Sequence, residues 1–361
     1  MGFSGKSATR TFGILTAGGD CPGLNAAIRG VCRTAHDRYN MTILGIAGGF
    51  RGLINGDFRI LNPEDFSGIL TRAGTILGTS REKPFKSTEI GEDKVRIIKD
   101  NYLKYKLDAL VVLGGNGTHT TGYLLEQEGL NILGLPKTID NDIEGTERSF
   151  GFNSAMSICT DAIDRLHSIA ASHNRVMVIE TMGHKAGWLA LHSGIAGGGD
   201  VIIIPEIPYD IKAIARHLNN RAKMGKSFSI VVVAEGALSV EEAQMDKKDR
   251  KKHRLESGIP FIGYKVAREI EAETGMETRA TVLGHVQRGG IPSAGDRILA
   301  TRFGTAAAEL LARGEYGKMI AQTGSEITSV DLAIPAGKTK KVPKNDPHLE
   351  TATAIGTCLG I

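Results

Sequence analysis

The 361-residue sequence is poor in several features that mark particular classes of protein. Aromatic residues make up only 5% of it, and 44 Lys and Arg against 40 Asp and Glu leave a net charge of +4. So small an excess of positive charge, with so few rings to stack on bases, argues against nucleic acid as a partner. No apolar run approaches the roughly 18 residues that span a bilayer, so we expect no membrane partner either.

Cysteine is also scarce. The four cysteines (Cys21, Cys32, Cys159 and Cys358) lie far apart, with no Cys-x-x-Cys pair and no histidine cluster at zinc spacing. This spacing argues against a disulfide scaffold or a structural zinc site and favours reduced thiols. Residues 1–6 (MGFSGK) contain no apolar signal core, and Lys6 stands where a myristoylation motif has Ser or Thr. We therefore expect a cytoplasmic protein.

Glycine, by contrast, is abundant. Its 46 residues are nearly twice the usual ~7%, so many backbone positions need close approach or a positive φ. Hydrophobic residues at 41% and charged residues at 23% are ordinary for a globular protein. At roughly 150 residues per domain, the length suggests about two domains.

Short β-branched runs recur along the chain, each followed by a segment with helical spacing. Because such continuous apolar strands are buried on both faces, they indicate parallel sheets covered by helices. The alternation predicts an α/β fold, open and doubly wound, with mainly parallel sheets. A polar loop near Phe150 marks a domain division, and the dense charge of residues 241–254 is typical of a solvated surface insertion. The predicted strands are residues 11–17, 108–113, 132–135, 175–179, 201–204 and 230–234.

Two glycine-rich loops follow predicted strands, at residues 18–25 (GGDCPGLN) and 114–118 (GGNGT). Adjacent glycines let backbone N–H groups approach an anion, and the following helix N-terminus adds a favourable dipole. Either loop alone could be only a tight turn. Neither completes a standard nucleotide motif: Asn220 stands where a Walker A motif needs Gly, and Thr120 where a G-x-G-x-x-G motif needs one.

A third loop, residues 136–142 (PKTIDND), places two carboxylates two residues apart beside a Lys and a Thr. One carboxylate can accept a proton from an attacking hydroxyl while the other orients metal or water. The same loop could instead be an Asx-rich turn whose side chains cap local backbone groups.

Cationic side chains gather near strand ends. Each alone could be an ordinary surface residue, but together they suit a substrate with several phosphate groups. Glu235, which ends another strand, could accept hydrogen bonds from a sugar hydroxyl. The combination predicts phosphoryl transfer to a phosphorylated metabolite. These residues are Arg81, Arg175, His184, Lys185, Arg279, His285 and Arg288.

With these motifs in this order, the chain closely resembles the 6-phosphofructokinase family from residue 11 to about 308, including residues 277–290 (ETRATVLGHVQRGG). The resemblance implies two Rossmann-like domains with the active site in the cleft between them. Residues 1–150 with about 287–340 would bind the donor, and residues 151–286 with the C-terminal tail would bind the sugar phosphate. The implied reaction is phosphoryl transfer from ATP to the C1 hydroxyl of fructose 6-phosphate in glycolysis, with Mg²⁺ as cofactor.

The resemblance also implies roles for single residues. Asp140 looks like the general base, Thr138 would lie beside the transferred phosphoryl group, and Arg175 and Arg288 would clamp substrate and developing charge. Arginines corresponding to Arg175 and Arg279 reach across from a neighbouring subunit in the family, which implies a homodimer or homotetramer. The sugar-phosphate site would further include Met182, Gly183, His184, Glu235, Arg279 and His285. The donor site would include Gly19, Arg81, Glu82, Gly115, Asn116, Gly117 and Thr118.

Three departures from the family pattern bear on the mechanism. Asn116 stands where the family commonly has an acidic magnesium ligand, so Asp20 or Asp142 would carry more of the metal's charge. This departure also raises the alternative of a non-catalytic protein that binds nucleotide and sugar phosphate. The basic effector pocket of bacterial relatives is only partly present: Arg29 and Arg33 match it, but Pro63 and His167 replace arginines. Control by ADP or phosphoenolpyruvate therefore does not follow.

The phosphoryl donor depends on Gly117 and Lys137. A Gly at position 117 resembles ATP users, because pyrophosphate users place Asp there, where it excludes the nucleotide's inner phosphate. Lys137 is common among pyrophosphate users, but it also occurs in a mixed group that contains ATP enzymes. Since steric exclusion is close to binary and an added cation is permissive, we expect ATP, with a pyrophosphate-dependent phosphotransferase as the alternative.

Overall fold

The computed structural model describes residues 7–86, 93–256 and 258–361, so the N-terminal residues 1–6 considered above lie outside it. The chain forms two compact units. The first consists of Met1–Ile139, Ile143–Ser154 and Arg288–Thr339, and the second of Asp140–Asp142, Ala155–Gln287 and Lys340–Ile361. The division expected near Phe150 thus falls after Ser154, and residues 140–142 group with the second unit.

The first unit is built on an eight-stranded sheet in the order β12-β11-β5-β4-β1-β2-β3, with β6 paired to β5. Its inner pairs are parallel, whereas β3 and β12 run antiparallel to their neighbours at the two edges. The strands are β1 (Thr11–Thr16), β2 (Thr42–Ile46), β3 (Phe58–Ile60), β4 (Ala109–Gly114), β5 (Ile132–Thr138), β6 (Phe150–Gly151), β11 (Lys318–Thr323) and β12 (Glu326–Asp331).

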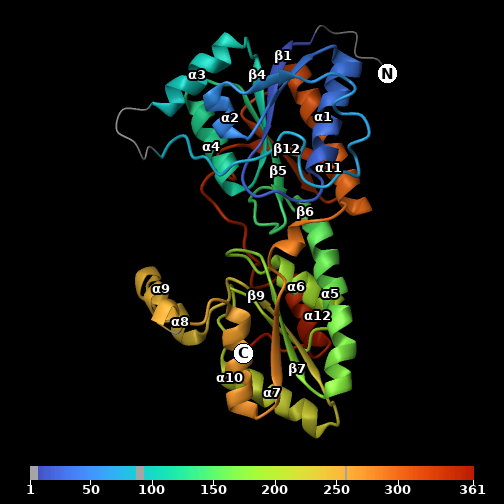
Figure 1. Ribbon diagram of the computed structural model, residues 1–361, viewed down its shortest axis with the longest axis vertical. Helices are drawn as coiled ribbons and strands as arrows, with labels where there is room; N and C mark the ends of the chain where they lie inside the picture. Colours follow the sequence, from blue (N-terminus) through green and yellow to red (C-terminus); the bar gives the residue numbers. More distant parts are fainter. Residues whose placement is uncertain (1–6, 87–92, 257) are drawn as a thin grey trace. The chain divides into compact units, whose positions relative to one another are not determined.

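Helices cover both faces of this sheet. On one face lie α1 (Leu24–Tyr39) and α11 (Ala294–Arg313), and on the other α2 (Phe50–Asn55), α3 (Lys94–Lys104) and α4 (Asn116–Gln127) (Figure 1). Close packing of α1 and α11 requires glycine at their crossing, because a Cβ on Gly304 would lie 2.6 Å from the Ala27 carbonyl oxygen.

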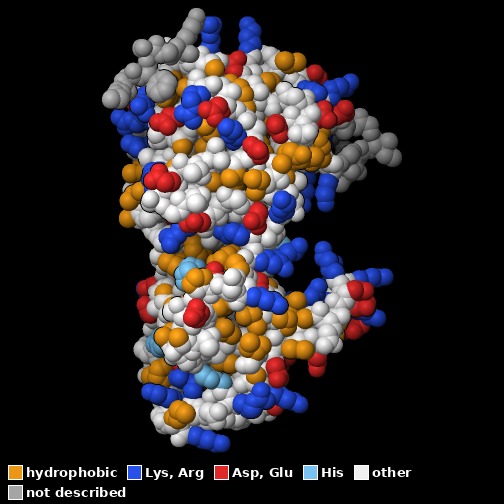
Figure 2. Space-filling model, turned by 180° about the vertical axis from the view of Figure 1, so that it is seen from behind, with side chains coloured by type: hydrophobic (Ala, Val, Ile, Leu, Met, Phe, Trp, Pro, Cys, Tyr) orange, Lys and Arg blue, Asp and Glu red, His pale blue; other side chains and the backbone are white. Residues whose placement is uncertain are grey.

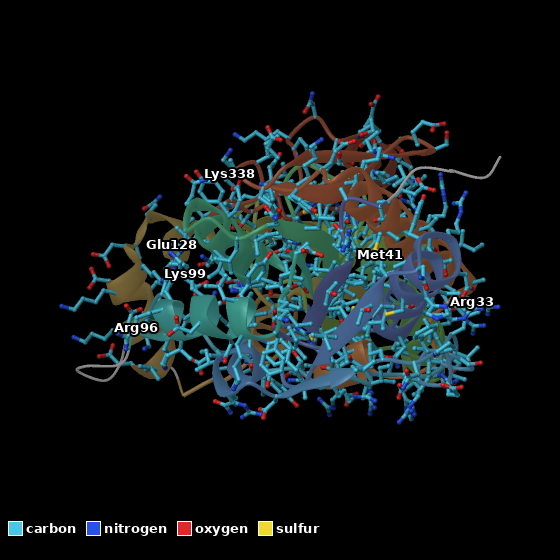
Figure 3. All side chains as sticks on the ribbon, turned by 90° about the horizontal axis from the view of Figure 1, so that it is seen from above. Arg33, Met41, Arg96, Lys99, Glu128 and Lys338 are labelled. Carbon is cyan, nitrogen blue, oxygen red and sulfur yellow. The ribbon has the colours of Figure 1, made fainter. Side chains whose placement is uncertain are left out.

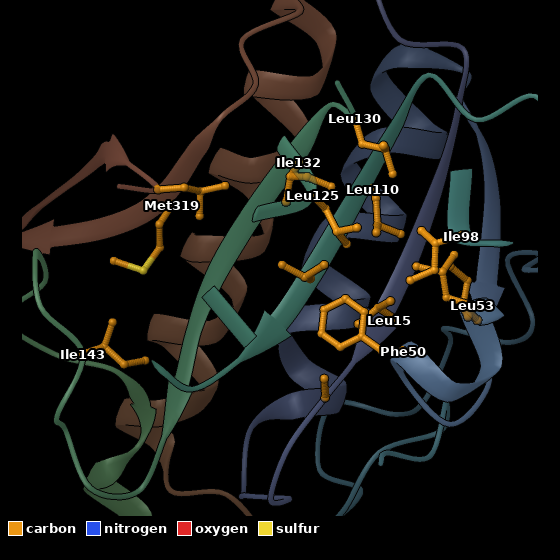
Figure 4. Packing of buried hydrophobic residues seen from close by; sticks show 14 residues of the cluster. Leu15, Phe50, Leu53, Ile98, Leu110, Leu125, Leu130, Ile132, Ile143 and Met319 are labelled. Atoms are coloured by element: carbon orange, nitrogen blue, oxygen red, sulfur yellow. The ribbon is translucent and has the colours of Figure 1, made fainter. Parts of the chain in front are cut away.

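The second face of this sheet carries the main hydrophobic core of the unit. Leu15, Leu110 and Ile132 from the strands meet Phe50 of α2 and Leu125 of α4 (Figure 4). Near the surface, Lys99 of α3 forms a half-exposed ion pair of 3.1 Å with Glu128, which follows α4 (Figure 3). Such an exposed pair contributes at most about 1 kcal/mol, so burial of the core supplies most of the stability.

The second unit has a four-stranded, fully parallel sheet in the order β10-β7-β9-β8. Helices α7 and α10 pack on one face and α5, α6 and α12 on the other (Figure 1). The strands are β7 (Val176–Thr181), β8 (Val201–Ile203), β9 (Ser229–Ala234) and β10 (Thr278–Val282). The helices are α5 (Phe152–His173), α6 (Trp188–Ala196), α7 (Ile211–Lys223), α10 (Ile262–Thr274), α12 (Pro347–Ala354) and the 3-10 helix η1 (Gly284–Arg288).

The charged segment expected as a surface insertion forms α8 (Val240–Gln244) and α9 (Lys247–Glu256), which we call the arm. No residue of α9 is buried, as the sequence predicts. The prediction is wrong for Glu242 of α8, which is only 1% exposed and forms ion pairs with Arg254 at 2.8 Å and Lys265 at 3.2 Å. This carboxylate fastens the arm to α10.

The four cysteines carry free thiols, as their spacing predicts. Burial raises the pKa of Cys21 and of Cys159 to about 12, which keeps both thiols protonated and unreactive. Among the helices of the described residues, none is both long enough and apolar enough to cross a membrane.

Candidate active site

The first glycine-rich loop joins β1 to α1 and is tied to two cations. Gly18 and Gly23 have left-handed φ values of 84° and 101°. Gly19 lies against the guanidinium of Arg288, which a Cβ at this position would displace, since it would lie 2.3 Å from Nη1. Arg288 donates to the Asp20 carbonyl at 3.1 Å, and the buried Lys137 donates to the Gly19 carbonyl. Two positive charges therefore stand at a loop whose predicted ligand is a phosphate.

The segment that carries Arg81 and Glu82 is hydrogen-bonded to this same loop. The Gly18 N–H donates to the Ser80 carbonyl at 2.9 Å, and the Thr79 hydroxyl donates to the Gly18 carbonyl at 2.7 Å. Arg81 is exposed, while Glu82 forms an ion pair of 3.1 Å with Lys94. These bonds place the segment that carries Arg81 and Glu82 beside the first glycine-rich loop.

The second glycine-rich loop leads from β4 into α4. Gly115 is the N-cap of α4 and no side chain caps this helix end, which leaves it suited to an anion. Thr118 links the two loops, since its hydroxyl donates to the Ala17 carbonyl at 3.4 Å. At the exposed Gly117, an added Cβ would meet no atom of the described residues within 4 Å. The fold itself therefore does not demand glycine at position 117.

The carboxylate loop follows β5 and is buried. Thr138, Asp140 and Asp142 are 8%, 9% and 9% exposed, and Asn141 between the two acids has a left-handed φ of 50°, which Asn tolerates. The Ser149 hydroxyl donates to the Thr138 carbonyl at 2.8 Å. Surface Asx-turns keep their carboxylates in water, so the burial of both acids favours the catalytic interpretation over the turn.

At the carboxyl ends of β7 and β9, a tight turn presents the residues expected to bind the sugar phosphate. The His184 N–H donates to Oε1 of Glu235 at 2.8 Å, and the Glu235 N–H donates to the Thr181 carbonyl at 2.8 Å. Gly183 has a φ of 141°, and a Cβ there would lie 2.5 Å from the Ala186 carbonyl oxygen. The turn residues Met182 to His184 are thereby held beside Glu235.

A residue that sequence reasoning missed joins this turn to the loop after β10. The fully buried Gln287 accepts from the Met182 N–H and the Cys159 thiol, both at 3.1 Å, and its Nε2 donates to the Gly284 carbonyl at 2.9 Å. It lies in η1 beside the exposed His285. A neutral amide between His285 and Arg288 in the motif stretch was the signal that could have revealed it.

Arg175 and Arg279 lie elsewhere, at the amino end of the same sheet. Both pair with Glu277, at 2.8 Å and 2.6 Å, and the hydrogen bond from Arg175 holds the pKa of Glu277 below its ordinary value. Arg175 precedes β7 and Met182 follows it, so a strand of six residues, roughly 20 Å long, separates them. Grouping these two arginines with the cations that follow strands was therefore wrong for a single chain.

The residues proposed for metal and effector binding are less closely assembled. Within the described residues, no group of three or more His, Cys, Asp or Glu side chains could hold a metal ion. Asp20 is exposed, whereas Asp142 is buried. Arg33 forms an ion pair of 3.4 Å with Asp37, and His167 hydrogen-bonds the Gly197 carbonyl at 2.7 Å. His167 thus supports its own unit, which agrees with a reduced effector pocket.

Comparison with known proteins gives the chain's family. The family model described as Phosphofructokinase matches residues 11–311. The ATP-dependent 6-phosphofructokinase of Spirochaeta thermophila is 64% identical, with a match that covers 98% of this chain and 99% of that protein. The ATP-dependent 6-phosphofructokinase of Propionibacterium freudenreichii subsp. shermanii is 47% identical over 96% and 98% of the two chains.

Solved structures share the architecture. Phosphofructokinase from Saccharomyces cerevisiae superimposes with a TM-score of 0.79 at 30% identity, over 90% of this chain and 45% of that longer chain. The pyrophosphate-dependent phosphofructokinase from Marinobacter aquaeolei has a TM-score of 0.79 at 21% identity, over 97% and 88%, a likeness of fold. From the order of its motifs, its two α/β units and these matches, the chain belongs to the phosphofructokinase family.

Proposed function

We propose that this chain transfers the terminal phosphoryl group of ATP to the C1 hydroxyl of D-fructose 6-phosphate, giving fructose 1,6-bisphosphate and ADP in glycolysis. The observation that carries the proposal is the buried carboxylate loop after β5, with Asp140 and Asp142 beside Thr138. Two relatives that match nearly the whole chain are named ATP-dependent 6-phosphofructokinase, which supports ATP as the donor.

In the proposed reaction, Asp140 accepts the proton of the C1 hydroxyl as its oxygen attacks the terminal phosphorus of ATP. The bond from that phosphorus to the bridging oxygen breaks, and ADP leaves with the electron pair. The Thr138 hydroxyl donates to the transferred group, and the Arg288 guanidinium offsets negative charge on the donor. Such a loose transition state depends chiefly on positioning and charge compensation.

Each unit supplies one substrate site in this proposal. The first holds the donor phosphates at Gly19, Arg81, Glu82 and residues 115–118. The second holds the sugar phosphate at Met182, Gly183, His184, Glu235 and His285. In support, Gly19 and residues 115–118 follow the carboxyl ends of β1 and β4, and Met182 and Glu235 follow those of β7 and β9, where ligands bind in such folds.

Mg²⁺ is the proposed cofactor, and the residues fit it in a limited way. Mg²⁺ usually takes one or two carboxylates with substrate phosphates and keeps several waters, so a full protein cage is unnecessary. The Asp142 carboxylate would hold it, and the Asn116 amide would contribute a neutral oxygen. When bound, the ion would neutralise charge on the donor phosphates.

We further propose a homo-oligomer, dimer or tetramer, in the cytoplasm. Arg175 and Arg279 stand at the amino end of the second sheet, so they would bind the sugar phosphate of a neighbouring copy. Glu277 holds both guanidinium groups in place within their own chain.

A donor comparison tests the proposal. Purified protein with fructose 6-phosphate and Mg²⁺ should form fructose 1,6-bisphosphate with ATP. Turnover with pyrophosphate alone would support the pyrophosphate-dependent alternative that Lys137 suggests. Thermal stabilisation by both ligands without product from either donor would instead identify a binding protein.

A Gly117→Ala variant sharpens the donor assignment. Its methyl group would have no atom of residues 7–86, 93–256 and 258–361 within 4 Å, and alanine in a helix is favoured over glycine by up to about 1 kcal/mol, so stability should hold or rise. Contact with the donor should nevertheless raise the KM for ATP by ~10-fold, the cost of about 1.4 kcal/mol. Steady-state kinetics measure the KM for ATP, and thermal melts measure the stability. The KM for fructose 6-phosphate is the control and should not change. An unchanged KM for ATP would remove position 117 from the donor site.

A further inference from the structure

A cavity of about 420 Å³ lies beneath the arm, between α9 and the segment that begins α10. Its residues take no part in the candidate active site. This volume is within the range of pockets that bind small organic molecules, roughly 300–1,000 Å³. The lining of the cavity includes the cations Lys247, Arg250 and Lys251, the apolar residues Leu255 and Phe261, and the carboxylate of Glu242.

The charges in this cavity are unbalanced. Glu242, the carboxylate of the lining, is fully engaged by Arg254 and Lys265. Within the described part of the chain, Lys247, Arg250 and Lys251 form no ion pair with a carboxylate; Arg250 instead donates to the Glu242 carbonyl at 3.4 Å. Three positive charges therefore face one small volume, which matches a ligand with several negative charges.

The lining also contains apolar side chains that are open to solvent. Leu255 is 72% exposed and Phe261 is 46% exposed, although both are large hydrophobic residues. Figure 2 shows Lys and Arg side chains on the projecting arm and hydrophobic side chains near its base. Inorganic phosphates would need only the cations. The apolar side chains favour an organic polyanion whose uncharged part packs on Leu255 and Phe261.

Binding of such a ligand would stabilise the arm itself. Helix α9 has ten residues, none of them buried, and a helix of that length without packing is marginal in water. Repulsion among its cations weakens it further. Arg254 fastens it, through Glu242 and through a hydrogen bond of 2.8 Å to the Ala237 carbonyl. A polyanion bound to Lys247 and Lys251 would remove the repulsion.

We propose that the cavity beneath α9 binds an organic polyphosphate of the nucleoside polyphosphate class, with its phosphates on Lys247, Arg250 and Lys251 and its ring against Phe261. The same site is regulatory, because Arg254 holds the carbonyl of Ala237 two residues after Glu235. A ligand that orders the arm alters the turn that presents Glu235. This regulatory part rests on the proposed function, whereas the binding site does not.

The test compares two double variants of α9. Lys247→Gln/Lys251→Gln removes two cations from the cavity lining, and Lys248→Gln/Lys252→Gln removes two from the same helix outside it. Calorimetric titration with ATP should find one more equivalent bound per chain in the wild type and in the control than in the cavity variant. The affinity of the extra site should fall roughly 100-fold in the cavity variant, since each charged contact contributes about tenfold or more.

Further measurements separate the ligand's two parts and the two proposals. Phe261→Ala should weaken the binding of ATP at the extra site and leave the binding of inorganic tripolyphosphate unchanged. The extra equivalent should change the KM for fructose 6-phosphate in the wild type but not in the cavity variant, whose kcat should match the wild type. The proposed site would be overturned if the wild type and both double variants bound the same number of ATP equivalents per chain. It would also be overturned if the control variant lost the extra equivalent as the cavity variant does. Because stoichiometry needs no turnover, an inactive protein would refute the proposed function and leave this test intact.

Discussion

The two ends of the parallel sheet in the second unit are built differently. At the carboxyl end, the Met182 turn, Glu235 and η1 are joined by hydrogen bonds, several of them to the buried Gln287. At the amino end, Arg175 and Arg279 share the partly exposed Glu277. A parallel sheet collects its strand-following loops at the carboxyl end, so Arg175 and Arg279 at the amino end stand apart from the carboxyl-end residues of their own chain.

The difference extends to rigidity. Buried hydrogen bonds to a backbone fix the position of a turn, because breaking one leaves a polar group without a partner. Ion pairs near the surface contribute little and exchange readily with solvent or a ligand. The carboxyl end is therefore suited to holding a substrate in one geometry, and the amino end is suited to releasing its guanidinium groups to an incoming phosphate.

The largest effect should come from Asp140, the base proposed among the residues of the carboxyl ends. Asp140→Asn keeps the shape of the side chain and removes its capacity to accept a proton, so kcat should fall by ~10²- to 10⁴-fold. Steady-state assays measure the fall, and thermal shifts with ATP and fructose 6-phosphate should be preserved. A rate near that of the wild type would move the role to Asp142.

The next effect tests whether the amino end acts on another copy. Arg279→Ala should weaken the binding of fructose 6-phosphate by ~10- to 100-fold, the range for the loss of a charged hydrogen bond. Co-expression with Asp140→Asn should form hybrid oligomers that bind fructose 6-phosphate more tightly in turnover than Arg279→Ala alone, because some sites then receive an intact Asp140 and an intact Arg279.

A matched pair from one end provides the control. Hybrids of Asp140→Asn with His285→Ala should show no such recovery over His285→Ala alone, since both residues belong to the site of a single chain. Equal recovery in the two mixtures, or none in either, would contradict the division of labour between the ends of the sheet.

Gln287 should show a smaller, more selective effect. Gln287→Leu leaves the Met182 N–H and the Gly284 carbonyl without their partner, which should raise the KM for fructose 6-phosphate ~10-fold while kcat changes little. Gln287→Glu keeps the acceptor oxygen and should recover part of the loss. A lower melting temperature with an unchanged KM would mean that Gln287 supports only the fold.

The smallest effect concerns pH and the arm. Burial opposes ionisation of Glu242, but hydrogen bonds from Arg254 and Ser239 and the charge of Lys265 lower its pKa from 4.5 to about 2. A carboxylate with a lowered pKa contributes stability that is complete above pH 4.5 and is lost as the pH falls toward 2. Urea unfolding should show that the difference in stability between wild type and Glu242→Gln shrinks over this range. A difference in stability that stays constant over this pH range would contradict the lowered pKa of Glu242.

Much of this arrangement could be predicted from the sequence. The continuous apolar runs predicted β1, β4, β5, β7, β8 and β9, because strands buried on both faces need no polar alternation. The glycine-rich loops and the Asp140 loop were placed after strands, where the structure has them. Strands β2, β6, β10 and β11 were missed, as were the edge strands β3 and β12, which are partly exposed and lack such runs.

The remaining errors have a common physical cause. Nearness to a strand in sequence does not say whether a side chain lies at the strand's beginning or its end, which is how Arg175 and Arg279 were misplaced. Nor does local sequence show that Glu242 would be buried against Arg254, twelve positions later, or that Gln287 would reach the Met182 N–H 105 positions earlier. Such partners depend on tertiary packing.

The empty space above Gly117 has a consequence for how this lineage can change. Among the described residues no atom lies within 4 Å of a Cβ added there, so the fold accepts a substitution at Gly117. Under the proposed function such a substitution acts on the phosphoryl donor alone, and preference between ATP and pyrophosphate can then shift in single mutational steps, without compensating changes in the core.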